Sequence, residues 1–260
     1  MIKNLIFDFG KVLVNHDLQP LLERHFGDDE VSLIGFHKIL SDPEFINMCD
    51  RGIIPFEKMI DGAIKRYPEY SDAFTFFKDN YLEEITGEIE GMHVLLKKLK
   101  QSGFKLYGLT NWSDTIYRVM EKFDIFQLLH GVVISCEEHF IKPEKEIYLR
   151  LCDKYSLKPS ECLFTDDRMV NVLGAKAIGM EAVLFTTTKK YIFEPSRYFT
   201  GRIAGAGLAA GFAALQIHLA LNEKIVRYQK RIGLQGYEGL PFGTYLIRIN
   251  EKTFKIQLSK

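Results

Sequence analysis

The sequence predicts an α/β protein with a doubly wound parallel sheet. Between residues 89 and 188, short apolar runs that suit buried strands alternate with amphipathic helical segments. Such alternation is typical of parallel strands joined by helices. The chain has 260 residues, of which 47% are hydrophobic, so it is long enough and apolar enough to form a large core.

Composition excludes some classes of function. Lysine plus arginine (34) balances aspartate plus glutamate (34), so there is no broad positive surface and we expect no nucleic-acid partner. The four cysteines lack the close spacing of a metal site or redox pair, and we expect reduced thiols. Asp8 comes too early for the apolar region of a signal peptide, so we predict a cytoplasmic protein.

The first predicted element is a buried strand at residues 5–7, which ends in the turn Asp8-Phe9-Gly10. Residues 18–88 lack strong strand runs, and their pattern is that of a small helical bundle. Within them, four apolar residues recur at helical spacing: Phe56, Met59, Ile60 and Ala63.

After Gly91 the pattern changes to alternating strands and helices. Strands are predicted at residues 105–109, 132–134, 162–164 and 182–185. Helices between them are marked by the stripes Met92, Leu95, Leu96, Leu99; Ile116, Val119, Met120, Phe123; Tyr148, Leu151, Cys152, Tyr155; and Val172, Ala175, Ile178. Ser113 is predicted to cap the second of these helices.

Residues 189–260 have a different pattern and are predicted to be a C-terminal extension made of a helix and a β-hairpin. Residues 203–221 are rich in alanine and glycine, and basic residues follow them. Their length is near that of a membrane span, which makes membrane contact and a membrane-associated protein one alternative. A helix packed against a partner and a segment without native packing are the others. Strands at 244–249 and 253–258, with a turn at Asn250-Glu251, predict the hairpin.

Five polar residues follow four of the predicted strands: Asp8, Thr110, Lys142, Asp166 and Asp167. The carboxyl ends of parallel strands meet at one edge of a sheet, so these side chains should converge on one cleft. A carboxylate such as Asp8 can attack phosphorus, and the aspartate pair can hold a hard cation. Thr110 and Lys142 can bind the oxygens of the transferred group, and Lys142 can keep Asp8 ionised.

Each residue alone has a structural explanation. Asp8 is a common turn former, Thr110 can simply end a strand, and Asp166-Asp167 can cap a helix. Lys142-Pro143 is typical of a loop that enters a helix. The functional interpretation gains weight because all of these positions follow strands on one edge of the predicted sheet.

Four stretches, in this order and spacing, resemble the motifs of haloacid dehalogenase-like hydrolases, and the resemblance covers about residues 1–188. The stretches are residues 5–13, 109–113, 141–144, and 163–167 with Asn171, Val172, Ala175, Gly179 and Met180. The resemblance implies a Rossmann-like core at 1–17 and 89–188 and an inserted helical cap at 18–88.

The resemblance also implies an activity. It indicates hydrolysis of small phosphorylated metabolites, such as sugar phosphates, by a magnesium enzyme with Asp8 as nucleophile. The Mg²⁺ ligands would be Asp8, the Gly10 carbonyl, Asp166 and Asp167. By analogy with the family, the substrate contacts would be His16, Asn111 and Trp112.

One departure from the family pattern concerns proton transfer. Phosphatases of this family usually have a second aspartate two residues after the nucleophile, and Gly10 stands there. Loss of a general acid costs ~10²–10⁴-fold in rate. Two alternatives therefore stay open: a binding or regulatory module on a degenerate core, and a 2-haloacid dehalogenase, whose halide needs no proton.

Overall fold

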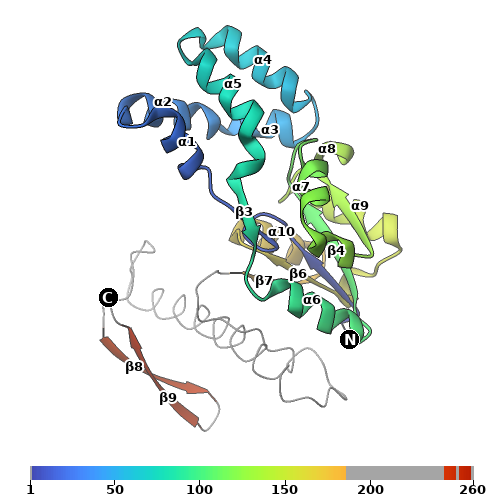
Figure 1. The fold of residues 1–260 in the computed structure, drawn as a ribbon. Helices are drawn as coiled ribbons and strands as arrows, with labels where there is room; N and C mark the ends of the chain where they lie inside the picture. The colour runs from blue at the N-terminus through green and yellow to red at the C-terminus, as the bar shows by residue number, and fades with distance from the viewer. Residues whose placement is uncertain (1, 186–242, 250–251, 259–260) are drawn as a thin grey trace. The chain divides into compact units, whose positions relative to one another are not determined.

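A computed structural model describes residues 2–185, 243–249 and 252–258 (Figure 1). The chain divides into two compact units, Met1–Ile217 and His218–Lys260. The first unit contains the central sheet and its helices. The described part of the second unit is a two-stranded antiparallel ribbon.

Five strands form the central sheet in the order β5-β4-β1-β6-β7, and every neighbouring pair is parallel. Their bounds are β1 Asn4–Phe7, β4 Lys105–Thr110, β5 Gly131–Ile134, β6 Cys162–Asp166 and β7 Glu181–Leu184. The predicted α/β class is confirmed. The chain moves outward from β1 through β4 to β5, and then returns to β6 on the other side of β1. Ligands of such sheets bind in the crevice beyond the strand ends where this reversal occurs.

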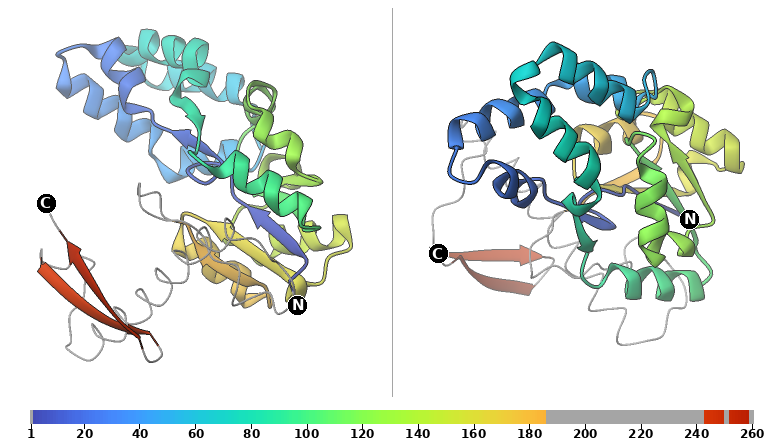
Figure 2. Two further views of the ribbon diagram at one scale, coloured as in Figure 1. Left: turned by 60° about the horizontal axis from the view of Figure 1, so that its bottom comes forward. Right: turned by 45° about the horizontal axis from the view of Figure 1, so that its top comes forward.

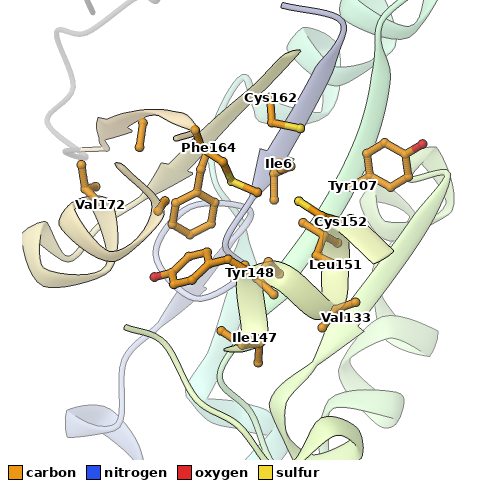
Figure 3. Packing of buried hydrophobic residues seen from close by; sticks show 14 residues of the cluster. Ile6, Tyr107, Val133, Ile147, Tyr148, Leu151, Cys152, Cys162, Phe164 and Val172 are labelled. Atoms are coloured by element: carbon orange, nitrogen blue, oxygen red, sulfur yellow. The ribbon is translucent and has the colours of Figure 1, made fainter. Parts of the chain in front are cut away.

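Helices connect these strands, and both faces of the sheet are buried: Leu5 and Ile6, which point to opposite faces of β1, are almost fully covered. The bounds of the helices are α6 Met92–Gln101, α7 Ile116–Lys122, α8 Ser135–Glu138, α9 Lys145–Tyr155 and α10 Met169–Ala177. Figure 3 shows Tyr148 and Leu151 of α9 among sheet residues that include Ile6 and Phe164, all fully or nearly fully buried. Burying side chains of this size contributes about 1.5–3 kcal/mol each, so this packing fixes the strands that carry the site.

Residues 19–80 form five α-helices that lie together in Figures 1 and 2. They are α1 Gln19–Phe26, α2 Glu30–Leu40, α3 Pro43–Asp50, α4 Phe56–Arg66 and α5 Ser71–Asn80. They share a core of their own, in which the fully buried Phe36 and Phe74 rings meet with centroids 4.7 Å apart. The four residues predicted to share one face of α4 are all buried.

A short ribbon links these helices to the sheet. β2 (Val14–His16) pairs antiparallel with β3 (Ile85–Glu88). The prediction of helix throughout residues 18–88 is therefore wrong at its end. Residues 14–16 (Val-Asn-His) and 85–88 (Ile-Thr-Gly-Glu) contain no apolar run, which is why the sequence pattern did not reveal these strands.

The start of α7 also differs from the prediction. The helix begins at Ile116, after Thr115. Ser113 does not cap it; the Ser113 hydroxyl instead accepts a hydrogen bond from the Thr115 N–H (3.3 Å) and lies 2.8 Å from the Thr115 hydroxyl. These bonds hold the turn that follows β4.

In the C-terminal unit, β8 (Gly243–Ile249) pairs antiparallel with β9 (Lys252–Leu258). This confirms the two strands of the predicted hairpin. The predicted turn at 250–251 and the apolar segment 203–221 lie outside the described residues. Within the part of the chain that is described, no helix has the length and apolar character that crossing a membrane requires.

Candidate active site

Asp8 lies at the centre of the site because it directly follows the central strand β1. Its N–H donates to the Thr165 carbonyl (2.9 Å), which continues the pairing of β1 with β6. The residue is buried, with 8% of its surface exposed. The backbone therefore fixes a largely buried carboxylate at the point where the strand order reverses.

Lys142 bridges two of the predicted acids. Its ammonium nitrogen lies 2.7 Å from Asp8 Oδ1 and 2.7 Å from Asp166 Oδ2, and it also donates to the Leu109 carbonyl at 3.0 Å. These three bonds use all three donors of the ammonium group. Residues from the ends of β1, β4 and β6 thus converge on one cation, as the sequence predicted.

Asn111 holds the loop that carries Lys142. Its side-chain oxygen accepts from the Lys142 N–H at 2.7 Å, and its side-chain nitrogen donates to the Lys142 carbonyl at 3.0 Å. Asn111 lines the pocket, but its amide is occupied by this peptide. Asn111 therefore positions Lys142, and its predicted substrate contact stays a prediction.

The two neighbouring aspartates differ in their surroundings. Asp166 is fully buried, and its carboxylate accepts from Lys142, the Arg168 N–H and the Asn171 side chain. Among the described residues, no hydrogen bond or ion pair reaches the Asp167 carboxylate. Asp167 therefore has lone pairs free for a ligand.

The site fits a hard divalent cation. Asp8, Asp166 and Asp167 each offer a carboxylate oxygen, and the three oxygens lie within 4.8 Å of one another. Carboxylate oxygens are the ligands that Mg²⁺ prefers. In addition, the buried Thr110 Oγ1 has no hydrogen-bond partner within the described chain. A buried hydroxyl is usually paired, so this one indicates a missing polar ligand.

Electrostatics also favour a bound cation. Burial is the main cause that raises the pKa of Asp8, to about 6; Lys142 opposes this shift and Asp166 adds to it. Burial opposes the charge on Lys142, but Asp8 and Asp166 outweigh it and raise the pKa of Lys142. Burial and then Asp166 raise the pKa of Asp167. A cation among these carboxylates would favour their ionised forms.

Gly10, Trp112 and His16 line the same pocket. A Cβ atom built on Gly10 would lie 3.6 Å from the Trp112 ring, an ordinary contact distance. The Trp112 indole N–H donates to the Thr115 hydroxyl at 3.1 Å. His16 meets the Trp112 ring edge-on at 6.0 Å, and its Nε2 lies 3.3 Å from Glu84 Oε1.

The pocket has a volume of about 380 Å³ and two kinds of wall. One wall is the polar strand edge with Asp8, Thr110 and Lys142. The other comes from the helices α2 to α5 and is largely apolar. Its lining residues from these helices are Leu40, Phe45, Ile46, Cys49, Asp50, Phe56, Met59 and Phe77. A bound molecule would therefore meet a charged end and an apolar end.

Sequence reasoning missed several residues of this site. Asp50 and Glu84 line the pocket, and Arg168 and Asn171 hold Asp166. Asn171 belongs to a recognised motif, which is a usable signal. Asp50 has no motif of its own, because only the packing of α3 brings it to the pocket.

The fold and the site define a doubly wound α/β protein with a lysine-bridged acidic centre at the strand ends. The family profile of haloacid dehalogenase-like hydrolases matches residues 2–179. The chain therefore belongs to the haloacid dehalogenase-like hydrolase family and is an enzyme of that family, as the motif resemblance predicted.

Individual relatives match parts of the chain. Flavin mononucleotide hydrolase 1 of Arabidopsis thaliana is 31% identical over 97 residues, which are 37% of this chain and 40% of that protein. The glyceraldehyde 3-phosphate phosphatase of Methanopyrus kandleri is 30% identical over 107 residues, 38% of this chain and 44% of that protein. The chain spans less than half the length of these two relatives.

Among solved structures, a haloacid dehalogenase family enzyme of Bacteroides thetaiotaomicron in complex with magnesium and inorganic phosphate has a similar fold. The TM-score is 0.60 at 22% identity, over 77% of this chain and 100% of that chain. At this identity the likeness concerns the fold alone.

Proposed function

We propose that the chain is a phosphatase that hydrolyses small phosphate monoesters through a phosphorylated Asp8. One observation carries the proposal: Lys142 joins Asp8 to Asp166 beside the unpaired Thr110 hydroxyl, inside a pocket that opens to a ligand. This arrangement supports Asp8 as a nucleophile beside two groups that would bind phosphoryl oxygens. The phosphatases among the relatives support the same class of substrate.

In the first step, an Asp8 oxygen attacks phosphorus and the bond to the leaving oxygen breaks. The Lys142 ammonium and the Thr110 hydroxyl bind the transferred phosphoryl oxygens as negative charge moves between them. In the second step, water attacks the phosphorus of the aspartyl-phosphate and releases inorganic phosphate. Asn111 keeps Lys142 in place through its peptide group during both steps.

The same proposal includes Mg²⁺ as cofactor. Asp8, the Gly10 carbonyl, Asp166 and Asp167 would hold the ion, and Asp167 has the free lone pairs for it. Bound Mg²⁺ supplies positive charge that screens the repulsion between the Asp8 carboxylate and an anionic phosphate.

The helices α1–α5 act as a cap in this proposal. They supply the apolar wall opposite Asp8 and so enclose the organic part of the substrate. Enclosure excludes water from the phosphoryl group and selects the substrate by shape. The apolar wall favours a monoester with an apolar portion over a small, fully hydroxylated sugar phosphate.

The direct test is Asp8→Asn with a chromogenic aryl phosphate and Mg²⁺. The substitution keeps the size of the side chain but removes the nucleophilic oxygen, so kcat should fall at least ~10³-fold. Asp28→Asn, at an exposed loop position, serves as the matched control and should leave kcat unchanged. A chelator should abolish turnover of the unaltered protein, and added Mg²⁺ should restore it.

Full activity of Asp8→Asn would exclude Asp8 as nucleophile.

A second candidate function is hydrolysis of 2-haloacids, which the absence of a carboxyl at Gly10 favours because a leaving halide needs no proton. It predicts halide release that survives the chelator. If the protein binds phosphorylated metabolites but hydrolyses none of them, it would instead be a binding or regulatory module on a degenerate core.

A further inference from the structure

The leaving oxygen of an alkyl phosphate needs a proton, and Gly10 cannot donate one. The described pocket has four lining carboxylates: Asp8, Asp50, Glu84 and Asp167. Asp8 and Asp167 belong to the acidic cluster, and Glu84 is paired with His16. The Asp50 carboxyl has neither a hydrogen bond nor an ion pair with the described residues.

Asp50 is the last residue of α3, and its backbone carbonyl is hydrogen-bonded to the sheet side of the pocket. Its carbonyl accepts a hydrogen bond from the Ser135 hydroxyl at 2.5 Å, and that hydroxyl also accepts from the Trp112 N–H at 2.9 Å. This link fixes the end of α3 next to the turn that follows β4. The carboxyl group of Asp50 stays free.

The next residue, Arg51, ties the same segment to the Lys142 loop. Its guanidinium forms an ion pair with Glu144, with one bond of 3.0 Å, and Glu144 accepts from the Ile141 N–H at 3.1 Å. The His139 ring nitrogen Nδ1 lies 2.7 Å from the Arg51 carbonyl. Asp50 and Lys142 are therefore held by one network, although they lie in different parts of the chain.

Gly52 completes the attachment. Its φ is +63°, and an added Cβ would lie 2.1 Å from the Cys136 carbonyl oxygen. Only glycine allows this close approach to α8. Three consecutive residues, Asp50 to Gly52, thus pack against the core, so the backbone that carries the Asp50 side chain is held in a fixed position.

The charges around Asp50 suit a proton donor. The charged groups that act on it are Lys142 and Asp8 of the candidate site, Arg168 after β6 and His16 of β2. Burial is the largest influence and raises the pKa of Asp50 to about 7; Asp8 adds to the rise, and Lys142 opposes it. A carboxyl in such surroundings can be protonated near neutral pH.

We infer that Asp50 is the catalytic residue that protonates the leaving oxygen, in place of the absent side chain at Gly10. The inference rests on the proposed phosphatase function. Asp8 belongs to the strand edge and Asp50 to the helical wall of the same pocket, so a phosphoryl group between them can have its nucleophile and its leaving oxygen on opposite sides. In-line transfer requires that arrangement.

Protons balance over the two steps of the reaction. As the Asp8–phosphorus bond forms and the ester P–O bond breaks, the Asp50 carboxyl proton moves to the leaving oxygen and gives the free alcohol. The Asp50 carboxylate then takes a proton from the attacking water while the bond between Asp8 and phosphorus breaks. The products are the alcohol and inorganic phosphate, and Asp50 is again protonated.

The test compares two monoesters that differ in their need for a proton: hexyl phosphate, and 2,4-dinitrophenyl phosphate, whose leaving phenolate is stable. Asp50→Asn should lower kcat/KM for hexyl phosphate by ~10²–10⁴-fold and change it less than ~3-fold for the dinitrophenyl ester. A merely structural role would affect both esters alike. Glu44→Gln, an exposed acid on the same helix, is the matched control and should affect neither.

A second variant tests the same idea by rescue. A Cβ fits at Gly10, so Gly10→Asp can be added to Asp50→Asn. The double variant should have a kcat/KM for hexyl phosphate at least ~10-fold higher than that of Asp50→Asn alone. Binding of inorganic phosphate, measured by calorimetry, should be unchanged in Asp50→Asn and shows that the pocket is intact. Equal losses on both esters, or no loss on either, overturn the role of Asp50. If the unaltered protein hydrolyses neither ester, the proposed function fails, and this inference fails with it.

Discussion

In the proposed function, Thr110 is a single residue that would serve a ligand at the expense of stability. It ends β4 fully buried, and its hydroxyl oxygen has no hydrogen-bond partner in the described chain. Burying an unpaired hydroxyl is unfavourable, so the free protein carries a penalty that a bound phosphoryl oxygen would relieve. The protein should therefore be less stable without ligand than its packing alone implies.

Thr110→Val should separate these two effects. Valine has the shape of threonine without the hydroxyl, so the free energy of unfolding should rise by about 1 kcal/mol, measured by urea denaturation. Turnover should fall by ~10²-fold, because a donor to the phosphoryl group is lost. Thr115→Val is the matched comparison: its hydroxyl is hydrogen-bonded to the Trp112 indole, so that change should lower stability. A Thr110→Val protein less stable than the original would contradict this explanation.

The sequence predicts site residues that belong to motifs better than it predicts residues that only the tertiary packing brings to the pocket. Asp8, Lys142 and Asp166 follow strands, so the strand pattern alone was enough to bring them together. The position of Asn111 was predictable, but the two hydrogen bonds that its amide makes with the Lys142 peptide were not, because they depend on the tertiary fold. Asp50 lies 42 positions from Asp8 and ends a helix, a place that no local pattern connects with the sheet.

At the scale of elements, the segment between α3 and α4 is the attachment of the helical part to the core. Arg51 pairs with Glu144, and the Phe56 N–H donates to the Asp114 carboxylate at 3.0 Å. Gly52 lies against the Cys136 carbonyl. The attachment is polar at both ends and closely packed in the middle, which fixes the helical wall over Asp8.

Gly52→Ala should displace this segment. The new Cβ would collide with the Cys136 carbonyl, and φ of +63° disfavours alanine, so we expect kcat/KM to fall at least ~10-fold through misplacement of the wall. Gly62→Ala is the control: Gly62 is exposed in α4, and an added Cβ meets nothing within 4 Å. It should raise stability by about 0.5–1 kcal/mol and keep activity. Equal activity of the two variants would contradict an attachment role for this segment.

The elements were predictable where the sequence has a clear apolar run or a helical spacing of apolar residues. The four apolar positions of α4 and the buried strands β1, β4 and β6 matched their periodic patterns. The ribbon of β2 and β3 was missed because its strands, Val-Asn-His and Ile-Thr-Gly-Glu, contain no apolar run. Their pairing depends on bringing residues 14 and 88 together, which is a property of the tertiary fold.

At the scale of the whole molecule, the strand order determines where chemistry can occur. Alternation of strands and helices predicted a parallel sheet, but it did not give the order β5-β4-β1-β6-β7. That order places β1 and β6 side by side, so Asp8 and Asp166 reach Lys142 from neighbouring strands. The helical insertion then covers the same edge and closes the pocket with an apolar wall.

The most direct test of the central claim is chemical trapping of the phosphorylated enzyme. The protein would be mixed with Mg²⁺ and 2,4-dinitrophenyl phosphate, quenched within one turnover and reduced with borohydride, which converts an aspartyl-phosphate to homoserine. Peptide mass spectrometry should then find homoserine at position 8 and at no other aspartate, and Asp8→Asn should show none. Steady release of phosphate without modification of Asp8, or modification at another carboxylate, would contradict the claim.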